Sequence, residues 1–178
     1  QERRLVSGVE FMSKKFVEYG LTSVCHDENV LSALQVARQR GTLLHRVSYE
    51  PDDTLTEAMI KTGIKTDFGD EWIKFGATSE HVVDGSFSER TAAMGKPYRG
   101  VTPSYSGNVT ERQADTNAWA ERVHRAGIRL NCHANGDVAI AQVMTAYEGA
   151  LKAFPVKNSR PKITHCTFIN DDLISRMK

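Results

Sequence analysis

The sequence lacks several features that would direct it to a particular class of protein. Its 178 residues contain three cysteines, Cys25, Cys132 and Cys166, which cannot all pair with one another. This indicates a reducing compartment instead of a disulfide scaffold, so we expect a cytoplasmic protein whose thiols pack in its core. No apolar run approaches the roughly 20 residues that a membrane-spanning helix needs, and we find no secretory signal.

The chain also lacks an excess of charge of either sign. With 23 basic and 22 acidic residues, its formal net charge is +1. It therefore has no basic surplus to neutralise phosphates, and we expect it to bind neither nucleic acid nor a membrane surface. There is no Gly-x-Gly-x-x-Gly after a predicted strand, so the phosphate cradle of a dinucleotide-binding fold is missing as well.

What the sequence does contain is a regular alternation of helix and strand patterns. Apolar residues recur at helical spacing in some segments, and short apolar runs lie between these segments. The predicted helices cover 5–19, 28–40, 53–62, 111–126 and 135–154, with another starting at 171. The predicted strands cover 21–26, 42–49, part of 72–83, 128–133 and 162–167.

This alternation is typical of βα units around a parallel sheet. We predict an α/β fold, a partial (β/α)8 TIM barrel of about five βα units, because polar residues end several strands as the inward-facing residues of a barrel mouth should. An open doubly wound sheet is the alternative. Since a complete barrel needs roughly 250 residues, we expect residues 1–178 to be a fragment of a single catalytic domain.

Three residues with reactive side chains each end a strand-like run: Lys74, His133 and His165. The carboxyl ends of parallel strands converge on one mouth of a barrel, so these three residues can share a site. Neutral imidazole is a common ligand of Zn, Fe or Ni, and two such ligands leave positions open for water. The alternative is that each histidine only caps its strand by hydrogen bonding to the backbone.

Lys74 must change chemically before it can bind a metal, because its ammonium group has three donors and no lone pair. Desolvation in a barrel would favour the free amine. That amine could form a Schiff base with a carbonyl substrate, or take up carbon dioxide to become a carbamate that ligates like a carboxylate. An ion pair with Asp70 or Glu71 at the edge of the strand is the structural alternative.

A long polar stretch with several glycines follows the predicted lysine strand, over 84–108. Loops of this length in compact domains are uncommon and often functional. Arg90 could grip a carboxylate at two points, and Asp84 and Ser86 could contact the substrate or support the residues that do. The predicted substrate-binding residues are Asp84, Ser86, Arg90 and Tyr98; ordinary turn chemistry is the alternative.

Several short motifs carry a resemblance to a known family. They are Gly20-Leu21-Thr22-Ser23-Val24, Trp72-Ile73-Lys74-Phe75, Val83-Asp84-Gly85-Ser86, Arg90-Thr91-Ala92, Pro97-Tyr98, His133-Ala134-Asn135-Gly136-Asp137 and Ile163-Thr164-His165. In these stretches the chain resembles the amidohydrolase superfamily, in the branch with the N-substituted formamide deformylases (amidohydrolase family 3). The Asp-Gly-Ser and Arg-Thr-Ala motifs together with His-x-x-Gly-Asp are specific, whereas any one alone is weak.

The resemblance implies a barrel with a His-x-His on its first strand, a lysine, often carbamylated, on its fourth, histidines on its fifth and sixth, and an aspartate on its eighth. By resemblance Lys74, His133 and His165 match the fourth-, fifth- and sixth-strand ligands. The chain has no His-x-His and stops before an eighth strand. We therefore expect it to span strands two to six, without the family's β-sandwich, and to be inactive alone.

The activity that the resemblance implies is metal-assisted hydrolysis of a C–N bond in an amide or formamide-like small molecule. It makes His133 and His165 catalytic as well as metal-binding. It favours zinc, with iron, nickel or manganese as alternatives, and an exposed barrel edge would favour a homo-oligomer. Two other functions stay open: a Schiff-base lyase that uses Lys74, and a degenerate barrel without enzymatic activity.

Overall fold

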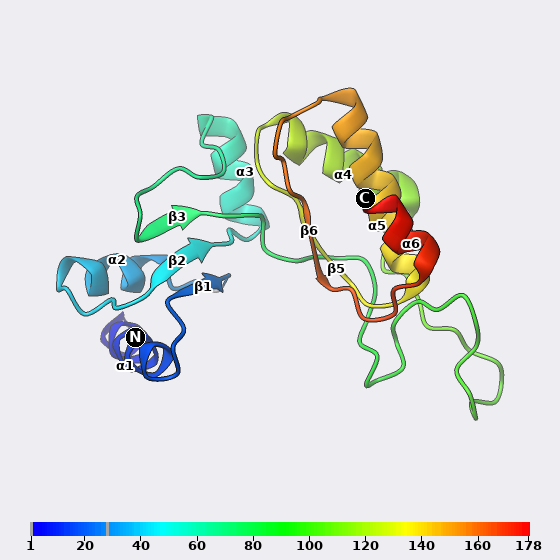
Figure 1. Cartoon of the computed structure of the whole chain (residues 1–178), viewed down its shortest axis with the longest axis horizontal. Helices are drawn as coiled ribbons and strands as arrows, with labels where there is room; N and C mark the ends of the chain where they lie inside the picture. The colour runs from blue at the N-terminus through cyan, green and yellow to red at the C-terminus, as the bar shows by residue number, and fades with distance from the viewer. Residues whose placement is uncertain (1, 28) are drawn as a thin grey trace. The chain divides into compact units, whose positions relative to one another are not determined.

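The structure, a computed structural model, describes residues 2–27 and 29–178 (Figure 1). It divides into two compact units, the first ending at Ser79 and the second spanning Glu80–Lys178. Each unit contains one three-stranded sheet in which all the strands are parallel. No helix in the described residues is long and apolar enough to cross a membrane.

The first unit follows the predicted order of elements, with shorter strands. It contains α1 (Glu2–Glu18), β1 (Ser23–His26), α2 (Leu31–Gln39), β2 (Arg46–Tyr49), α3 (Asp53–Thr62) and β3 (Ile73–Phe75). The helix predicted over 28–40 is present as α2, and position 28 lies outside the described residues. The prediction that 21–26 is a buried strand is wrong, because β1 forms an edge of the sheet and its residues are exposed or half-buried.

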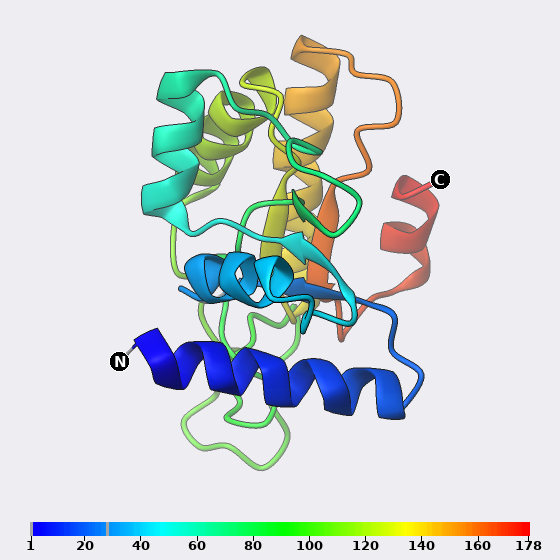
Figure 2. The same ribbon diagram turned by 90° about the vertical axis from the view of Figure 1, so that its left-hand side faces the viewer.

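The apolar stripes of α1 and α2 form the core of the first unit together with β2. The two helices lie side by side (Figure 2), and α2 presents small and branched residues to its neighbours. The buried core residues are Val6, Val9, Ala33, Leu34, Ala37, Leu43, Val47 and Tyr49. Helical spacing in the sequence therefore identified the faces that pack.

The second unit carries the remaining elements. They are β4 (His81–Val82), α4 (Gln113–Arg125), β5 (Asn131–Ala134), α5 (Asp137–Ala153), β6 (Lys162–His165) and α6 (Asp171–Arg176). In the sheet β5 lies between β4 and β6, and α5 packs against both α4 and β5. This central place of β5 brings the ends of three strands to one edge of the sheet.

The prediction of one strand within 72–83 is wrong, because this stretch contains two. β3 pairs with β2 in the first unit, whereas β4 pairs with β5 in the second. Between them the chain leaves the sheet at Gly76, where an added Cβ would lie 2.2 Å from Ser48 Oγ, and Ser79 donates its N–H to Pro51 O. Lys74 is therefore not on the strand that neighbours His133.

The predicted long loop is present between β4 and α4, and it is fastened at both ends. Thr110 donates its N–H to Val83 O and its hydroxyl to Val82 O. At Gly136 the loop passes so close that an added Cβ would lie 1.9 Å from the carbonyl oxygen of Ala93. A glycine is required at position 136 for this steric reason alone, since its φ is an ordinary −80°.

The first unit buries one histidine without full pairing. His45 is 1% exposed, and its ring packs against the rings of Phe16 and His26. Its Nδ1 lies 2.9 Å from Ser13 Oγ, but its Nε2 has no hydrogen-bond partner in the described part of the chain. Burial, and then the nearby charge of His26, lowers the pKa of His45 from its ordinary value.

Replacing Gly136 by alanine should destabilise the protein, because the new methyl group would meet the Ala93 carbonyl. We expect the free energy of unfolding to fall by about 1–3 kcal/mol, measured by urea denaturation. Gly149→Ala in the same helix is the control, since nothing lies within 4 Å of its added Cβ. The control should be neutral or slightly stabilising. Equal effects of the two variants would contradict this account of the loop crossing.

Protonation of His45 should destabilise the first unit in acid. Its pKa in the folded chain lies below the ordinary 6.5, so the unfolded chain binds the proton first as the pH falls. The contribution of neutral His45 to the free energy of unfolding is complete above its pKa in the unfolded chain, and it is lost as the pH falls through its lower pKa in the folded chain. His45→Gln cannot be protonated and should therefore lose less unfolding free energy than the wild type between about pH 7 and pH 5. If the free energy of unfolding, measured by denaturant titration, falls equally with pH in the wild type and in His45→Gln, then His45 is not responsible for the loss of stability in acid.

Candidate metal centre

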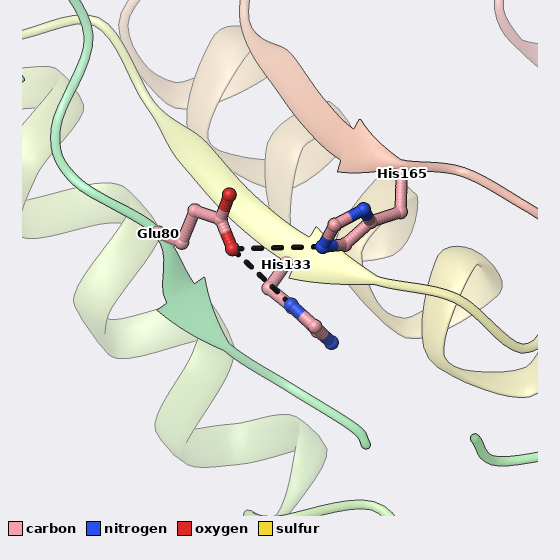
Figure 3. A group of neighbouring side chains, drawn as sticks. All are labelled: Glu80, His133 and His165. Atoms are coloured by element: carbon pink, nitrogen blue, oxygen red, sulfur yellow. Dashed lines mark hydrogen bonds and ion pairs between the residues drawn. The ribbon is translucent and has the colours of Figure 1, made fainter. Parts of the chain in front are cut away.

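Three side chains that can bind a metal meet in the second unit (Figure 3). Glu80 directly precedes β4, His133 lies in β5, and His165 ends β6. One oxygen or nitrogen atom from each lies within 4.8 Å of those of the other two. Glu80 Oε2 is 3.2 Å from His133 Nδ1 and 3.8 Å from His165 Nε2. The predicted pairing of the two histidines is thus present, and a carboxylate that the sequence did not reveal joins them.

A break in the strand brings His165 onto this face. His165 pairs in register with Ala134, the residue after His133, so regular alternation would place the two imidazoles on opposite faces. The backbone of His165 has a φ of 70° and that of Cys166 a φ of 51°, both in the left-handed region. The ring of His165 meets the ring of His133 edge to face at 4.6 Å. Such strain in two successive non-glycine residues is a feature of functional sites.

The hydrogen bonds of His133 fit a metal ligand. Its Nε2 lies 3.2 Å from the carbonyl oxygen of Gly85, an acceptor, and 3.1 Å from the amide nitrogen of Asn135, a donor, so either ring nitrogen can carry the proton. When the proton is on Nε2, it is donated to Gly85, and the lone pair of Nδ1 is available to a metal ion beside the Glu80 carboxylate. When it is on Nδ1, the ring donates to Glu80. A backbone carbonyl on the remote nitrogen is the usual partner of a metal-bound histidine.

The donor set itself suits a divalent transition metal. Two imidazoles and one carboxylate are ligands that zinc and iron accept, and they leave coordination positions for water or substrate. The side chains are 15% exposed at His133, 30% at Glu80 and 45% at His165. His133 is therefore the most buried of the three side chains, and His165 is the one most open to solvent.

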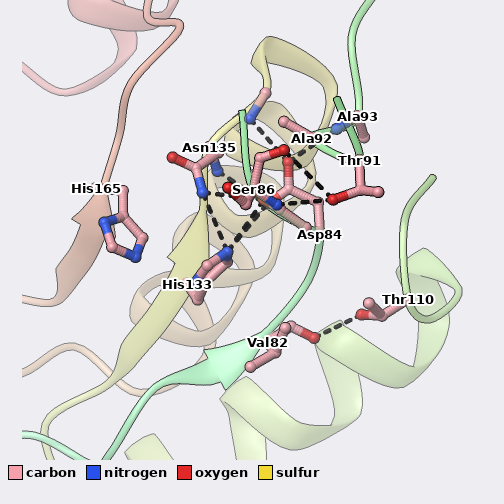
Figure 4. Close-up of polar contacts among 12 residues, drawn as sticks. Val82, Asp84, Ser86, Thr91, Ala92, Ala93, Thr110, His133, Asn135 and His165 are labelled. Carbon is pink, nitrogen blue, oxygen red and sulfur yellow. Dashed lines mark hydrogen bonds and ion pairs between the residues drawn. The ribbon is translucent and has the colours of Figure 1, made fainter. Parts of the chain in front are cut away.

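Asn135 ties the ends of the three strands together around His133 (Figure 4). Its side-chain amide donates to Gly85 O at 2.9 Å and lies 3.1 Å from His133 Nε2. Its side-chain oxygen accepts from the Thr167 hydroxyl, and its backbone oxygen accepts from the Phe168 N–H. One residue thus fixes the segment after β4 and the segment after β6.

Asp84 supports this arrangement from the interior. Its side chain is completely buried, and its carboxylate accepts three backbone N–H groups at 2.8–2.9 Å, from Ala93, Asn135 and Gly136. The charge also lies at the N-terminus of α5, where the helix dipole favours an anion. With both oxygens occupied, Asp84 can influence a substrate only through the backbone that it holds. Of the two roles expected from the sequence, the structure favours the supporting one.

The other predicted substrate-binding residues lie in the loop after β4. Ser86 is part of a turn closed by Thr91, and its hydroxyl pairs with that of Ser88. Arg90 is exposed on the same turn, in the left-handed region with a φ of 58°. Tyr98 donates to Ala92 O, and burial, with the Asp84 charge, raises its pKa. Their contact with a substrate stays a prediction.

Lys74 lies on β3 of the first unit, in an ion pair at the surface. Its Nζ is 3.3 Å from Asp67 Oδ1, and both side chains are about half exposed. Asp70, the ion-pair partner expected from the sequence, instead accepts the N–H groups of Ile73 and Trp72, which lower its pKa. In the second unit the acidic side chain beside His133 is Glu80, which directly precedes β4.

Sequence reasoning missed Glu80 because β4 is only His81–Val82, too short to give a strand pattern. A signal was nevertheless present, since Glu80 is four residues before Asp84, in the stretch that leads into the motif Asp84-Gly85-Ser86. The next residue, His81, pairs with Glu111 at 2.8 Å and stacks on Trp119. It holds the opposite face of β4 while Glu80 faces the histidines.

The cysteines differ in their surroundings. Cys132 is buried behind the site, beside Tyr147 of α5, and burial raises its pKa to about 12. This confirms that the neighbour of His133 faces a helix as a packing thiol. Cys166 is half-buried, and burial raises its pKa too. Cys25 is exposed, so the expectation of a buried thiol is wrong there, because β1 is an edge strand.

Asp84→Asn should weaken both the fold and the metal site. In asparagine an NH2 group replaces one carboxylate oxygen, and this group cannot accept the backbone N–H groups that the oxygen binds. We therefore expect the free energy of unfolding to fall by about 2–3 kcal/mol. Displacement of Asn135 and Gly85 should also lower metal affinity roughly tenfold. Asp115→Asn, which removes an exposed pair with Arg112, is the control and should cost less than about 1 kcal/mol. Denaturation and metal titration of both variants measure this; equal stability of the two would refute the role given to Asp84.

Comparisons with solved structures identify the fold. The chain superposes on an uncharacterized metal-dependent hydrolase from Pyrococcus horikoshii OT3 with a TM-score of 0.82 and 23% identity, over 99% of this chain and 35% of that one. For an uncharacterized metal-dependent hydrolase from Pyrococcus furiosus the TM-score is 0.79 and the identity 24%, over 94% of this chain and 34% of that one. The chain thus spans about a third of the length of these structures. The predicted fold class, α/β with parallel strands as in a partial (β/α)8 barrel, is confirmed.

No curated protein sequence matches the chain. The model of a protein family does match, over residues 4–178, and its description is amidohydrolase family. The match covers both units and includes Glu80, His133 and His165. The chain therefore belongs to the amidohydrolase family.

Proposed function

We propose that the chain forms the ligand-bearing part of a metal-dependent hydrolase, with Glu80, His133 and His165 as metal ligands. The observation that carries the proposal is the convergence of their ligating atoms within 4.8 Å at one edge of a parallel sheet. Membership of the amidohydrolase family supports it, as does the likeness to two metal-dependent hydrolases from Pyrococcus species. Zinc is the metal that we expect first from two imidazoles and a carboxylate.

Glu80 takes the place in this proposal that the resemblance gives to a carbamylated lysine. A carbamate and a carboxylate present the same pair of anionic oxygens, so glutamate can ligate without any modification. Metal binding by this site should then not depend on dissolved carbon dioxide. Lys74 keeps its surface ion pair with Asp67.

The residues of the site have different roles in the proposed reaction. A divalent metal supplies Lewis-acid polarisation of a carbonyl and activation of water. His133 is fixed by the Gly85 carbonyl, and its half-buried ring is shielded from solvent. His165 is the more exposed imidazole and lies on the side from which a substrate can approach. The proton acceptor is the eighth-strand aspartate that the resemblance implies.

We further propose that the bond broken is a C–N bond of an amide or formamide-like small molecule. This rests on the motifs shared with the deformylase branch, above all Asp84-Gly85-Ser86 with Arg90-Thr91-Ala92. The exposed guanidinium of Arg90 is suited to a carboxylate on such a substrate.

The Schiff-base lyase is the weaker alternative. An amine that attacks a carbonyl must be free of its proton, which desolvation promotes. Lys74 is instead half exposed and lies in a surface ion pair with Asp67, at 3.3 Å, outside any desolvated pocket that the structure shows around it. A degenerate barrel without activity would lack a stoichiometric metal, so metal analysis separates it from the hydrolase.

The proposed ligand set predicts the metal content of variants. Glu80→Gln and His133→Ala in the whole protein should each lower zinc affinity by roughly tenfold or more, because each removes a ligand. Lys74→Met is the matched control and should retain full metal content. Elemental analysis after dialysis, with and without bicarbonate, measures both the stoichiometry and the dependence on carbon dioxide. Loss of metal from the Lys74 variant, with Glu80→Gln unaffected, would contradict the proposal.

A further inference from the structure

Two exposed aromatic rings lie in the segments that follow β4 and β6, the two strands on either side of His133. Phe87 is 53% exposed in the loop after β4, and Phe168 is 37% exposed in the segment after β6. Their rings meet edge to face, with centroids 6.3 Å apart and planes at 77°. Ile169, next to Phe168, is 36% exposed and extends the apolar surface. Apolar side chains that gather at the surface next to polar ligands are typical of a binding site.

Hydrogen bonds of Asn135 hold the backbone segments that carry both rings next to His133. The Phe168 N–H donates to Asn135 O at 2.8 Å, so the backbone of the second ring is held directly. Phe87 follows Gly85 by two residues, and Gly85 O accepts from Asn135 Nδ2 and lies 3.2 Å from His133 Nε2. The segments that carry the two rings therefore both hydrogen-bond to Asn135, which in turn lies 3.1 Å from the proposed ligand His133.

Ordered backbone on both sides makes these rings a fixed feature. The turn that carries Phe87 is closed by Thr91, whose N–H and hydroxyl both donate to Ser86 O. A rigid aromatic pair offers a large apolar contact at a low cost in conformational entropy. Its chemistry selects a ligand with an aromatic or branched aliphatic group near the polar atoms that bind the metal.

We propose that Phe87 and Phe168 form an apolar wall of the substrate site, so that the enzyme favours substrates with an aromatic or bulky aliphatic group next to the scissile bond. This inference rests on the proposed metal centre and adds the substrate class to it. The wall determines specificity; it does not take part in the chemistry.

Hydroxamates test the wall separately from the metal. Acetohydroxamate and benzohydroxamate chelate zinc through the same two oxygens and differ in carrying a methyl or a phenyl group. In the zinc-loaded whole protein, calorimetry should show benzohydroxamate binding about fivefold or more tightly than acetohydroxamate. Phe87→Ala and Phe168→Ala should each reduce that ratio to about twofold or less, with the affinity for acetohydroxamate unchanged.

The control is Phe68→Ala, which removes an aromatic ring that is 60% exposed in the first unit and should leave the ratio as in the wild type. Equal affinities of the two hydroxamates for the wild type would overturn the wall and leave the metal centre intact, as expected if another part of the protein covers these rings. Binding of neither hydroxamate would overturn the metal centre and the wall together.

Discussion

The candidate site depends on the burial of one carboxylate. Asp84 has no exposed surface, and its oxygens bind backbone N–H groups from the long loop and from the start of α5. An unpaired buried charge would be very costly, so the surrounding chain has to bring these donors to it. Their positions in turn fix Gly85 and Asn135, which hold His133. The placement of His133 therefore depends on how the carboxylate of Asp84 is satisfied.

Much of the fold was predictable because local patterns determine it. Helical spacing of apolar residues marked the packing faces of α1 and α2, and glycines with a positive φ end α1 and α3 at positions 20 and 63. His133 and His165 were identified because both end clear strands, and parallel strands bring their carboxyl ends together. The strand β1 was predicted but its exposure was not, since its sequence says nothing about which neighbours it pairs with.

The carboxylate of the site could not be found in the same way. Glu80 precedes a strand whose entire length is His81–Val82, and so short a strand has no recognisable period. Lys74 ends a clear apolar run and was therefore predicted as the third ligand; in the structure it lies on β3, which pairs with β2 in the first unit, and its role as a ligand stays a prediction. The φ of 70° at His165 is set by tertiary contacts and not by its residue type.

The most direct test is the crystal structure of the zinc-loaded whole protein, with anomalous scattering recorded at the zinc edge. The account predicts one strong anomalous peak within bonding distance, about 2.0–2.2 Å, of Glu80, His133 Nδ1 and His165 Nε2. Zinc bound by a carbamylated Lys74, with the Glu80 side chain turned away from the histidines, would contradict it.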